Sequence, residues 1–289
     1  MYLLLIFKVP RDLADTLEEE FYGFNNLSWE TEEFEREVHF KFYFSITLKP
    51  EEEEKLNFLE KLAAKFEKVV LEYNLLKKEN WEEIWKYHFK PLRIGKKLLV
   101  LPPWEELSFE EELIPLYIDP GQAFGTGHHP TTRLMLENLE VFIKKICSKE
   151  RVPHILDMGC GSGILAIASA LLCPKAIVYA VDIDDLALEA TQKNAELNKV
   201  SSQLVILKEL PEDRDLKFHL ILSNIGFKEL KKLAPLFKQK SLPGRSFLLL
   251  SGILREDLKE LEKFYLALGF TRIKTQYQKE WAFLALKFS

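Results

Sequence analysis

Three glycines at alternate positions follow a short apolar run and precede a second one. The segment Ile155–Gly163 reads ILDMGCGSG, and the apolar run Ile164–Leu172 follows it directly. We expect a buried strand, a tight turn and a helix, because glycine accepts the backbone conformations of such turns and lets a ligand come close. The N-terminus of that helix would offer free N–H groups to a polar ligand. The pattern predicts a binding site for an adenosine-type cofactor, with Gly159 and Gly161 at its centre.

Two acidic side chains stand at the spacings that such a site needs. Asp157 lies two places before the first glycine, and Asp182 arrives near the end of the next strand-like run, Ile177–Ile183. A carboxylate at this second place accepts hydrogen bonds from ribose hydroxyls in related sheets. Ile164 stands where the dinucleotide fingerprint has its third glycine, which disfavours a nicotinamide cofactor. The combination resembles motif I of the class I S-adenosylmethionine-dependent methyltransferases, and S-adenosylmethionine is the cofactor that this resemblance implies.

A second glycine-rich segment, Asp119–Thr132, reads DPGQAFGTGHHPTT. Its turn-forming residues predict a loop, with Thr131 or Thr132 capping a helix that runs to about Ile146. The loop comes just before the strand of motif I. In an open α/β sheet we therefore expect it at the carboxyl ends of the strands, over the cofactor.

This loop supplies further candidate site residues. We take Phe124 as a candidate catalytic residue, and Thr126 and Gly127, together with Thr132 at its end, as candidate cofactor-binding residues. An adjacent histidine pair at 128 and 129 has no third ligand in sight, so no metal site is predicted.

The fourth strand of the predicted sheet ends in Asn224-Ile225-Gly226-Phe227. Methyl transfer from a sulfonium is an in-line displacement, so the protein mainly has to align a neutral nucleophile. The side-chain oxygen of Asn224 can accept a hydrogen bond from an amine, which favours a nitrogen acceptor. Deprotonating a lysine at pH 7 costs about 4 to 5 kcal/mol, whereas an α-amino group costs only about 1 kcal/mol. We expect the α-amine to be the easier target, with Asn224 and Phe227 as catalytic residues.

The chain is long enough for two domains. It has 289 residues, 47% of them apolar, which suffices for a sizeable core. Residues 1–78 read as strands alternating with helices, including strict alternation from Val38 to Lys49, and predict a small α+β ferredoxin-like domain for substrate recognition. Residues 79–92 predict a linker helix. Residues 93–289 predict a seven-stranded, Rossmann-like α/β sheet whose final strand is antiparallel, as in the class I methyltransferases.

Composition excludes several classes of protein. Cys147, Cys160 and Cys173 form no C-x-x-C pair, and the six histidines form no H-E-x-x-H, so we predict neither a disulfide framework nor a zinc site. A reducing, cytoplasmic setting follows. The opening MYLLLIF is too short for a signal sequence, and the longest apolar run cannot span a bilayer, so no membrane role is expected.

Charge is spread unevenly along the chain. Residues 1–60 hold 15 acidic against 6 basic side chains, which leaves 30 against 34 for the rest. Two interpretations fit an acidic front domain: a well-solvated surface, or a dock for a basic partner. A nucleic-acid footprint would have the opposite sign. We expect no direct nucleic-acid binding, and a monomer.

The loop and motif I together resemble the ribosomal protein L11 methyltransferases (the PrmA family). Their hallmark, D-P-G-x-A-F-G-T-G-x-H-P-T-T, is matched at 119–132, and further similarity covers Trp81, Trp85, Phe89, Pro91, Gly95 and Pro102-Pro103-Trp104. The resemblance implies a substrate, the stalk-base protein of the large ribosomal subunit, methylated on its α-amine and lysines and held by the N-terminal domain. It also implies that S-adenosylmethionine contacts Thr132, Gly159, Asp182 and Asn224.

The sequence departs from this family after the asparagine. The family usually continues with Ile-Leu-Ala, whereas Gly226 and Phe227 give Asn-Ile-Gly-Phe, at the spacing of the Asn-Pro-Pro-aromatic motif of enzymes that methylate planar nitrogens. We expect Phe227 to pack against the acceptor or the methionine part of the cofactor. Two alternatives stay open: a methyltransferase for a lysine or glutamine of another protein or for a nucleobase, and a cofactor-binding scaffold without turnover. The missing prolines and the acidic front domain argue against a nucleobase.

Overall fold

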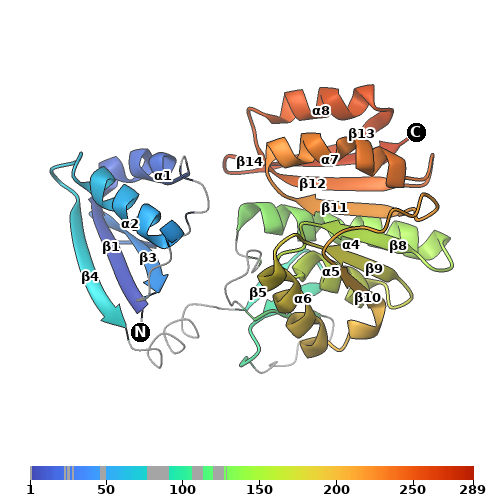
Figure 1. Cartoon of the computed structure of the whole chain (residues 1–289), viewed down its shortest axis with the longest axis horizontal. Coiled ribbons are helices and arrows are strands. Elements are labelled where there is room, and N and C mark those ends of the chain that lie inside the picture. The colour runs from blue at the N-terminus through green and yellow to red at the C-terminus, as the bar shows by residue number, and fades with distance from the viewer. Residues whose placement is uncertain are drawn as a thin grey trace. The chain divides into compact units, whose positions relative to one another are not determined.

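The chain forms two compact units, Met1–His88 and Phe89–Ser289 (Figure 1). The computed structural model describes residues 2–22, 24, 27, 29–45, 50–76, 91–105, 113–119, 127 and 129–289. The linker helix predicted over 79–92 lies outside these residues except for its last two positions.

The N-terminal unit is a four-stranded antiparallel sheet with its two helices on one face (Figure 1). Its elements are β1 (Tyr2–Pro10), α1 (Ala14–Tyr22), β2 (Glu30–Glu33), β3 (Glu37–Ser45), α2 (Pro50–Ala63) and β4 (Val70–Leu76). The strand order is β2-β3-β1-β4, and every neighbouring pair is antiparallel. This is the ferredoxin-like arrangement that the alternation of strands and helices predicts.

Aromatic side chains fill the core of the N-terminal unit. The ring of Phe21 lies edge-on to three others, with centroids 5.5 Å from Phe7, 5.1 Å from Phe40 and 5.0 Å from Phe42. None of the four is more than 1% exposed. Two of them belong to β3, so the predicted strand with one buried face is confirmed over Glu37–Ser45. The predicted residues beyond it, 46–49, lie outside the described residues.

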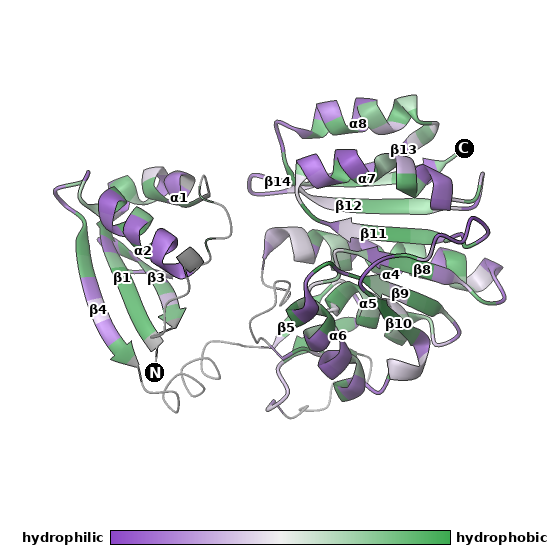
Figure 2. Ribbon diagram, in the orientation of Figure 1, coloured by the Kyte–Doolittle hydropathy of each residue, from purple (hydrophilic) through white to green (hydrophobic). Residues whose placement is uncertain are grey.

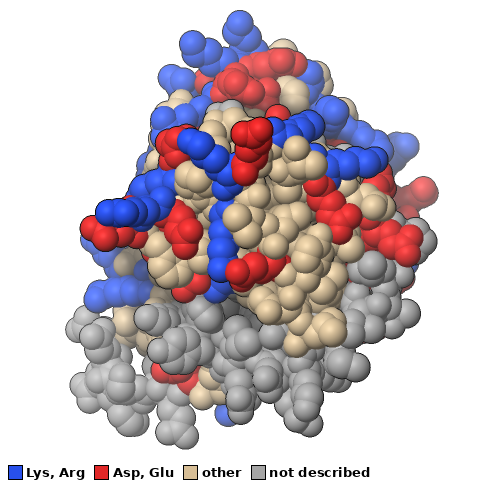
Figure 3. Space-filling view, turned by 90° about the vertical axis from the view of Figure 1, so that its left-hand side faces the viewer, with Lys and Arg blue, Asp and Glu red and all other residues tan. Residues whose placement is uncertain are grey.

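Acidic side chains of the N-terminal unit form ion pairs with its bases. Lys8 Nζ lies 2.5 Å from Glu72, and Arg11 pairs with Glu33 at 2.6 Å. Acidic and basic side chains are interspersed over the face in Figure 3, with no continuous acidic patch. Exposed pairs of this kind contribute little to stability.

The second unit is built on a seven-stranded sheet. Its strands are β8 (His154–Met158), β9 (Ile177–Val181), β10 (Leu204–Leu207), β11 (Leu220–Asn224), β12 (Phe247–Leu254), β13 (Phe270–Gln278) and β14 (Trp281–Phe288). They lie in the order β10-β9-β8-β11-β12-β14-β13, and β14 runs in the direction opposite to the other six. The predicted Rossmann-like methyltransferase sheet is confirmed.

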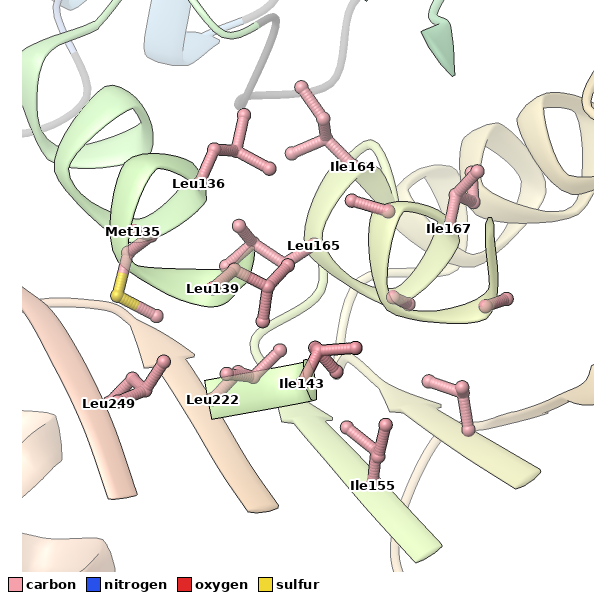
Figure 4. Close-up of a cluster of buried hydrophobic side chains, with 14 of the residues drawn as sticks. Met135, Leu136, Leu139, Ile143, Ile155, Ile164, Leu165, Ile167, Leu222 and Leu249 are labelled. Atoms are coloured by element: carbon pink, nitrogen blue, oxygen red, sulfur yellow. The ribbon is translucent and has the colours of Figure 1, made fainter. Parts of the chain in front are cut away.

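Helices cover both faces of this sheet. One face carries α4 (Pro130–Lys149), α5 (Ile164–Leu172) and α6 (Asp185–Leu197), and the other carries α7 (Phe227–Lys240) and α8 (Leu258–Ala267). Side chains of β11 alternate between the two: Leu222 joins the cluster beneath α4 and α5 (Figure 4), whereas Ile221 joins the cluster beneath α7 and α8. The central strands β11 and β12 are accordingly apolar over most of their length, whereas the edge strand β13 and the helices carry many polar side chains (Figure 2). In the described part of the chain, no helix is both long and apolar enough to cross a membrane.

A small second sheet precedes the hallmark loop. Strands β5 (Leu92–Ile94), β6 (Leu98–Leu101) and β7 (Ile114–Tyr117) form it, with β6 antiparallel to β5 and parallel to β7. The first of these strands, β5, is only three residues long. Because β7 ends just before Asp119, this sheet fixes the point from which the loop departs.

Two of the three cysteines form a disulfide, which the sequence analysis did not expect. Cys147, near the end of α4, is bonded to Cys173, directly after α5, and their Cα atoms are 6.0 Å apart. The absence of a C-x-x-C pair was the wrong criterion, because packing of α4 on α5 joins cysteines 26 positions apart. The argument from cysteine usage to a reducing setting therefore fails. Cys160 is buried and free, and burial raises the pKa of its thiol.

Candidate active site

The glycines of motif I shape a turn whose N–H groups are mostly used within the protein. Gly159, Gly161 and Gly163 have φ values of 77°, 54° and 78°, a region that side chains other than glycine rarely adopt. Gly159 and Cys160 donate to the carbonyl oxygen of Val181 at 2.8 and 3.1 Å, and Gly163 donates to that of Cys160 at 2.8 Å. The predicted free N–H groups are those of the first turn of α5, and their contact with a ligand stays a prediction. The glycines provide the turn geometry and room for close neighbours.

Asp182 lies just past the end of β9 and is tied to the motif I turn. Its Oδ2 accepts a hydrogen bond from the Gly161 N–H at 2.9 Å, and its Oδ1 accepts one from the Asp184 N–H at 3.1 Å. Two contacts thus fix the carboxylate in place. Each oxygen retains a second lone pair for a hydroxyl donor, and the predicted contact with ribose stays a prediction.

Asp157 is fully buried at the end of β8. Its Oδ2 accepts a hydrogen bond from the Ala166 N–H at 3.0 Å, so it holds the first turn of α5. Burial raises the pKa of Asp157 to about 7; the Ala166 hydrogen bond lowers it, and the charge of Asp182 raises it further. Among the described residues its Oδ1 has no hydrogen-bond partner. A buried carboxylate oxygen of this kind suits a ligand that brings a positive charge or a donor.

Helix α4 begins one residue before the predicted caps. His129 is its N-cap, and His129 Nδ1 accepts from the Thr131 N–H at 3.4 Å and lies 2.7 Å from Thr131 Oγ1. Pro130 occupies the first helical position, where a missing N–H costs nothing. The prediction of Thr131 or Thr132 as the cap is therefore wrong. Burial lowers the pKa of His129, which favours the neutral ring that this accepting role needs.

Asn224 and Thr132 meet across the site. Asn224 Nδ2 donates to Thr132 Oγ1 at 3.3 Å, which joins the end of β11 to the first turn of α4. Thr132 is fully buried. Asn224 Oδ1 is itself buried and has no partner within the described part of the chain. The amide is thus held by its donor side, with its acceptor side available.

The end of the hallmark loop lies beside motif I. Gly127 has a φ of 94°, and a β-carbon there would lie 3.4 Å from Ile164 Cδ1 and 3.5 Å from Val100 Cγ1. This places Gly127 beside the first residue of α5, and its cofactor-binding role stays a prediction. Phe124 and Thr126 lie outside the described residues, so their roles stay predictions.

Comparison with known proteins identifies the family. The family model described as ribosomal protein L11 methyltransferase (PrmA) matches residues 11–289. The chain belongs to this family. A relative named ribosomal protein L11 methyltransferase, from Citrifermentans bemidjiense, is 45% identical over 187 residues, which cover 63% of this chain and 59% of the relative. One of the same name from Syntrophotalea carbinolica is 37% identical over 84% of this chain and 80% of its own length.

A solved structure of the PrmA family shares the fold. The ribosomal protein L11 methylase of Lactobacillus delbrueckii subsp. bulgaricus superposes with a TM-score of 0.61 at 30% identity, over 69% of this chain and 99% of that one. The resemblance seen in the sequence is confirmed. The match to the first curated relative spans about three fifths of that relative's length.

Phe227, where this PrmA-family chain departs from the usual motif, begins α7. Its ring is half-buried against the cluster beneath α7 and α8, and Lys231 Nζ lies 5.2 Å from its centroid. Lys231 also pairs with Glu260 of α8 at 2.7 Å. These contacts are with its own helix and the neighbouring one. They give Phe227 a packing role, and its predicted contact with the acceptor stays a prediction.

Helix α6 supports the site through two residues that the sequence analysis missed. Thr191 Oγ1 donates to the Gly161 carbonyl oxygen at 3.0 Å, and Asn194 Nδ2 donates to that of Ser162 at 2.9 Å. Asn194 Oδ1 also accepts from the Asp119 N–H at 2.9 Å, which ties motif I to the start of the loop. Both side chains are at most 1% exposed. Polar residues three positions apart on the inner face of a helix were the available signal.

Metal ligands do not gather anywhere in the described residues: no group of three or more His, Cys, Asp or Glu side chains there could hold an ion.

Proposed function

We propose that this chain is an S-adenosylmethionine-dependent protein N-methyltransferase that modifies the α-amine and lysine side chains of ribosomal protein L11. The family is described as methyltransferases of that protein, and the relatives carry the same name. The observation that carries the proposal is the arrangement of Asn224, whose buried acceptor oxygen is available while its donor side is anchored to Thr132.

This arrangement suits an amine nucleophile. A neutral amine donates one N–H to Asn224 Oδ1 and so turns its lone pair in a fixed direction. The amide is uncharged and offers no base, so the acceptor's proton leaves to solvent before transfer. An α-amine loses that proton at pH 7 for about 1 kcal/mol and a lysine for about 4 to 5 kcal/mol. The α-amine is therefore the faster target of the two.

The residues present fit the proposed cofactor. S-adenosylmethionine, when bound, supplies a methyl group on a positively charged sulfur. The Asp182 carboxylate would accept its ribose hydroxyls, and Asp157 in its ionised form would favour its positive charge. Gly159 and Gly161 leave the backbone of the turn uncovered, and Thr132 closes the opposite side with Asn224.

In this proposal the N-terminal unit recognises the substrate, ribosomal protein L11. We assign residues 1–78 to substrate recognition, 79–92 to a linker helix and 93–289 to the methyltransferase domain. The excess of acidic side chains in residues 1–60 favours a basic client. We further propose that the protein acts as a monomer in the cytoplasm, where ribosomal proteins are made, without binding nucleic acid directly.

Intact-mass spectrometry tests the reaction and the substrate together. Ribosomal protein L11 from cells that lack its methylation is incubated with this protein and S-adenosylmethionine, and methyl increments are mapped to the α-amine and lysines. Increments at those nitrogens support the proposal. Cofactor binding without any increment on L11 would contradict it, and parallel incubations with total protein and ribosomal RNA would then identify another acceptor.

A variant of Asn224 tests the proposed role of this residue separately. Asn224→Ala removes the acceptor oxygen, so we expect methyl transfer to fall roughly 100-fold through lost alignment. Cofactor affinity, measured by calorimetry, should change far less. Equal losses in both would contradict the assignment of Asn224 to the acceptor amine.

A further inference from the structure

The turn that carries Asn224 rests on the neighbouring strand. Asn224 pairs with Ser251 in the parallel register of β11 and β12, so the next residue of β12, Gly252, lies beside Ile225. Gly252 has a φ of 81°, and it falls where the register of β12 with β14 shifts, between Leu250 and Ile253. The irregularity in β12 thus sits where β11 ends and the turn begins.

A side chain at Gly252 would occupy the space of the turn's backbone. A β-carbon there would lie 2.8 Å from the Ile225 carbonyl carbon, 3.0 Å from its nitrogen, and nearer still to its carbonyl oxygen. Real β-carbons essentially never approach other atoms as closely as the contacts with the carbonyl carbon and oxygen would require. Because the atoms in the way are main chain, no rotamer change of Ile225 relieves the clash. The turn itself would have to move.

The other side of Ile225 is equally confined. Its Cγ2 methyl lies where a β-carbon of Gly159 would be, so the side chain packs directly on the motif I turn. Ile225 is therefore held between two positions that lack a side chain, one in motif I and one in β12. The contacts of Ile225 with Gly159 and Gly252 fix how far the turn projects beyond the sheet. They therefore also fix the position of Asn224.

We propose that Gly252 is a positioning residue for methyl transfer: by admitting the Ile225 backbone, it holds Asn224 at the depth where its Oδ1 meets the acceptor nitrogen. The inference rests on the proposed function, because it assigns Gly252 a role through Asn224. Displacement of the turn would also stretch the hydrogen bond to Thr132, which is 3.3 Å long. In-line transfer is sensitive to misplacements of this size, whereas the cofactor contacts on motif I and Asp182 lie on other strands.

Gly252→Ala tests the proposal, and Gly244→Ala is its matched control. Gly244 has a similar φ of 70°, but a β-carbon there meets nothing within 4 Å. Both variants therefore carry the strain of a positive φ, and only the first displaces the turn. We expect kcat on ribosomal protein L11 to fall roughly 100-fold in Gly252→Ala, with the dissociation constant for S-adenosylmethionine within about threefold of wild type. Gly244→Ala should match wild type in both.

Two outcomes would overturn the inference. One is equal kcat in the Gly252→Ala and Gly244→Ala proteins, and the other is a loss in Gly252→Ala that appears wholly in cofactor affinity. If the wild-type protein does not methylate ribosomal protein L11, the proposed function itself is wrong. Failure of the proposed function can thus be told apart from failure of the inference about Gly252.

A second pair of variants decides the matter if Gly252→Ala does not fold. Ile225→Ala removes the methyl that packs on Gly159, whereas Ile225→Val keeps it. We expect kcat to fall in the alanine variant and to be restored in the valine variant, with cofactor affinity little changed in either. Wild-type kcat in Ile225→Ala would show that the turn needs no such support, and the inference would fail.

Discussion

The buried carboxylate of Asp157 makes a quantitative prediction about stability and pH. Burial raises the pKa of Asp157 from 3.8 to about 7, so between these values the folded protein holds a proton that the unfolded chain releases. A folded state that binds more protons loses stability as pH rises. Each pKa unit corresponds to about 1.36 kcal/mol, and the shift of about three units therefore removes about 4 kcal/mol between pH 4 and pH 8.

Asp157→Asn removes this dependence. The amide oxygen of asparagine keeps the hydrogen bond from the Ala166 N–H, which is 3.0 Å long in the wild type. Its NH2 group takes the place of the unpaired Oδ1 and stays buried without a partner, a cost that does not vary with pH. We therefore expect the free energy of unfolding of the variant, minus that of wild type, to rise by about 4 kcal/mol from pH 4 to pH 8.

Urea unfolding at several pH values measures this difference. Other titrating groups are common to both proteins, so they cancel when the two free energies are subtracted. Asp184→Asn is the control: Asp184 is exposed and caps α6 through Leu186, and asparagine caps a helix as well as aspartate does. That variant should keep the wild-type dependence on pH. A flat difference between wild type and Asp157→Asn across pH 4 to 8 would refute the reasoning.

Two further predictions concern the cofactor and the disulfide. Asp182→Ala should weaken S-adenosylmethionine binding by roughly 1 to 3 kcal/mol, the range for a hydrogen bond to a charged group; unchanged affinity in calorimetry would remove Asp182 from the site. Opening the Cys147–Cys173 bridge, which closes a segment with a sequence separation of 26, should cost about 3 to 4 kcal/mol of stability. Urea unfolding with and without reductant measures that cost, Cys147→Ser should be insensitive to reductant, and equal wild-type stability in both conditions would contradict the prediction.

Most of the fold could be predicted because its signals are local. The alternation of apolar and polar residues in β3 can be recognised from neighbouring residues alone. The strand of motif I is likewise indicated by an apolar run that ends in glycines. The order of the sheet then follows from the family resemblance. The paired site residues Gly161 and Asp182 were likewise placed by spacing along the chain, and a 2.9 Å hydrogen bond joins them.

What the sequence did not reveal depends on contacts between distant segments. The disulfide requires α4 to pack on α5, and no motif around Cys147 or Cys173 encodes that packing. The N–H groups of the motif I turn find their acceptor on Val181, at the end of a different strand. His129 as the cap of α4 is a different case: a proline at the next position favours the residue before it as N-cap, so that signal was present in the sequence.

The site therefore depends on backbone approach as much as on side-chain chemistry. Gly159 belongs to the turn that we assign to the cofactor, and Ile225 directly follows the residue that we assign to the acceptor; the two are in contact. A shift of the motif I turn would press on Ile225 and move Asn224. Because packed interiors resist such displacement, the motif I turn and Asn224 keep a fixed position relative to each other before the cofactor or the acceptor protein binds. That is the kind of organisation that an in-line transfer without a covalent intermediate requires.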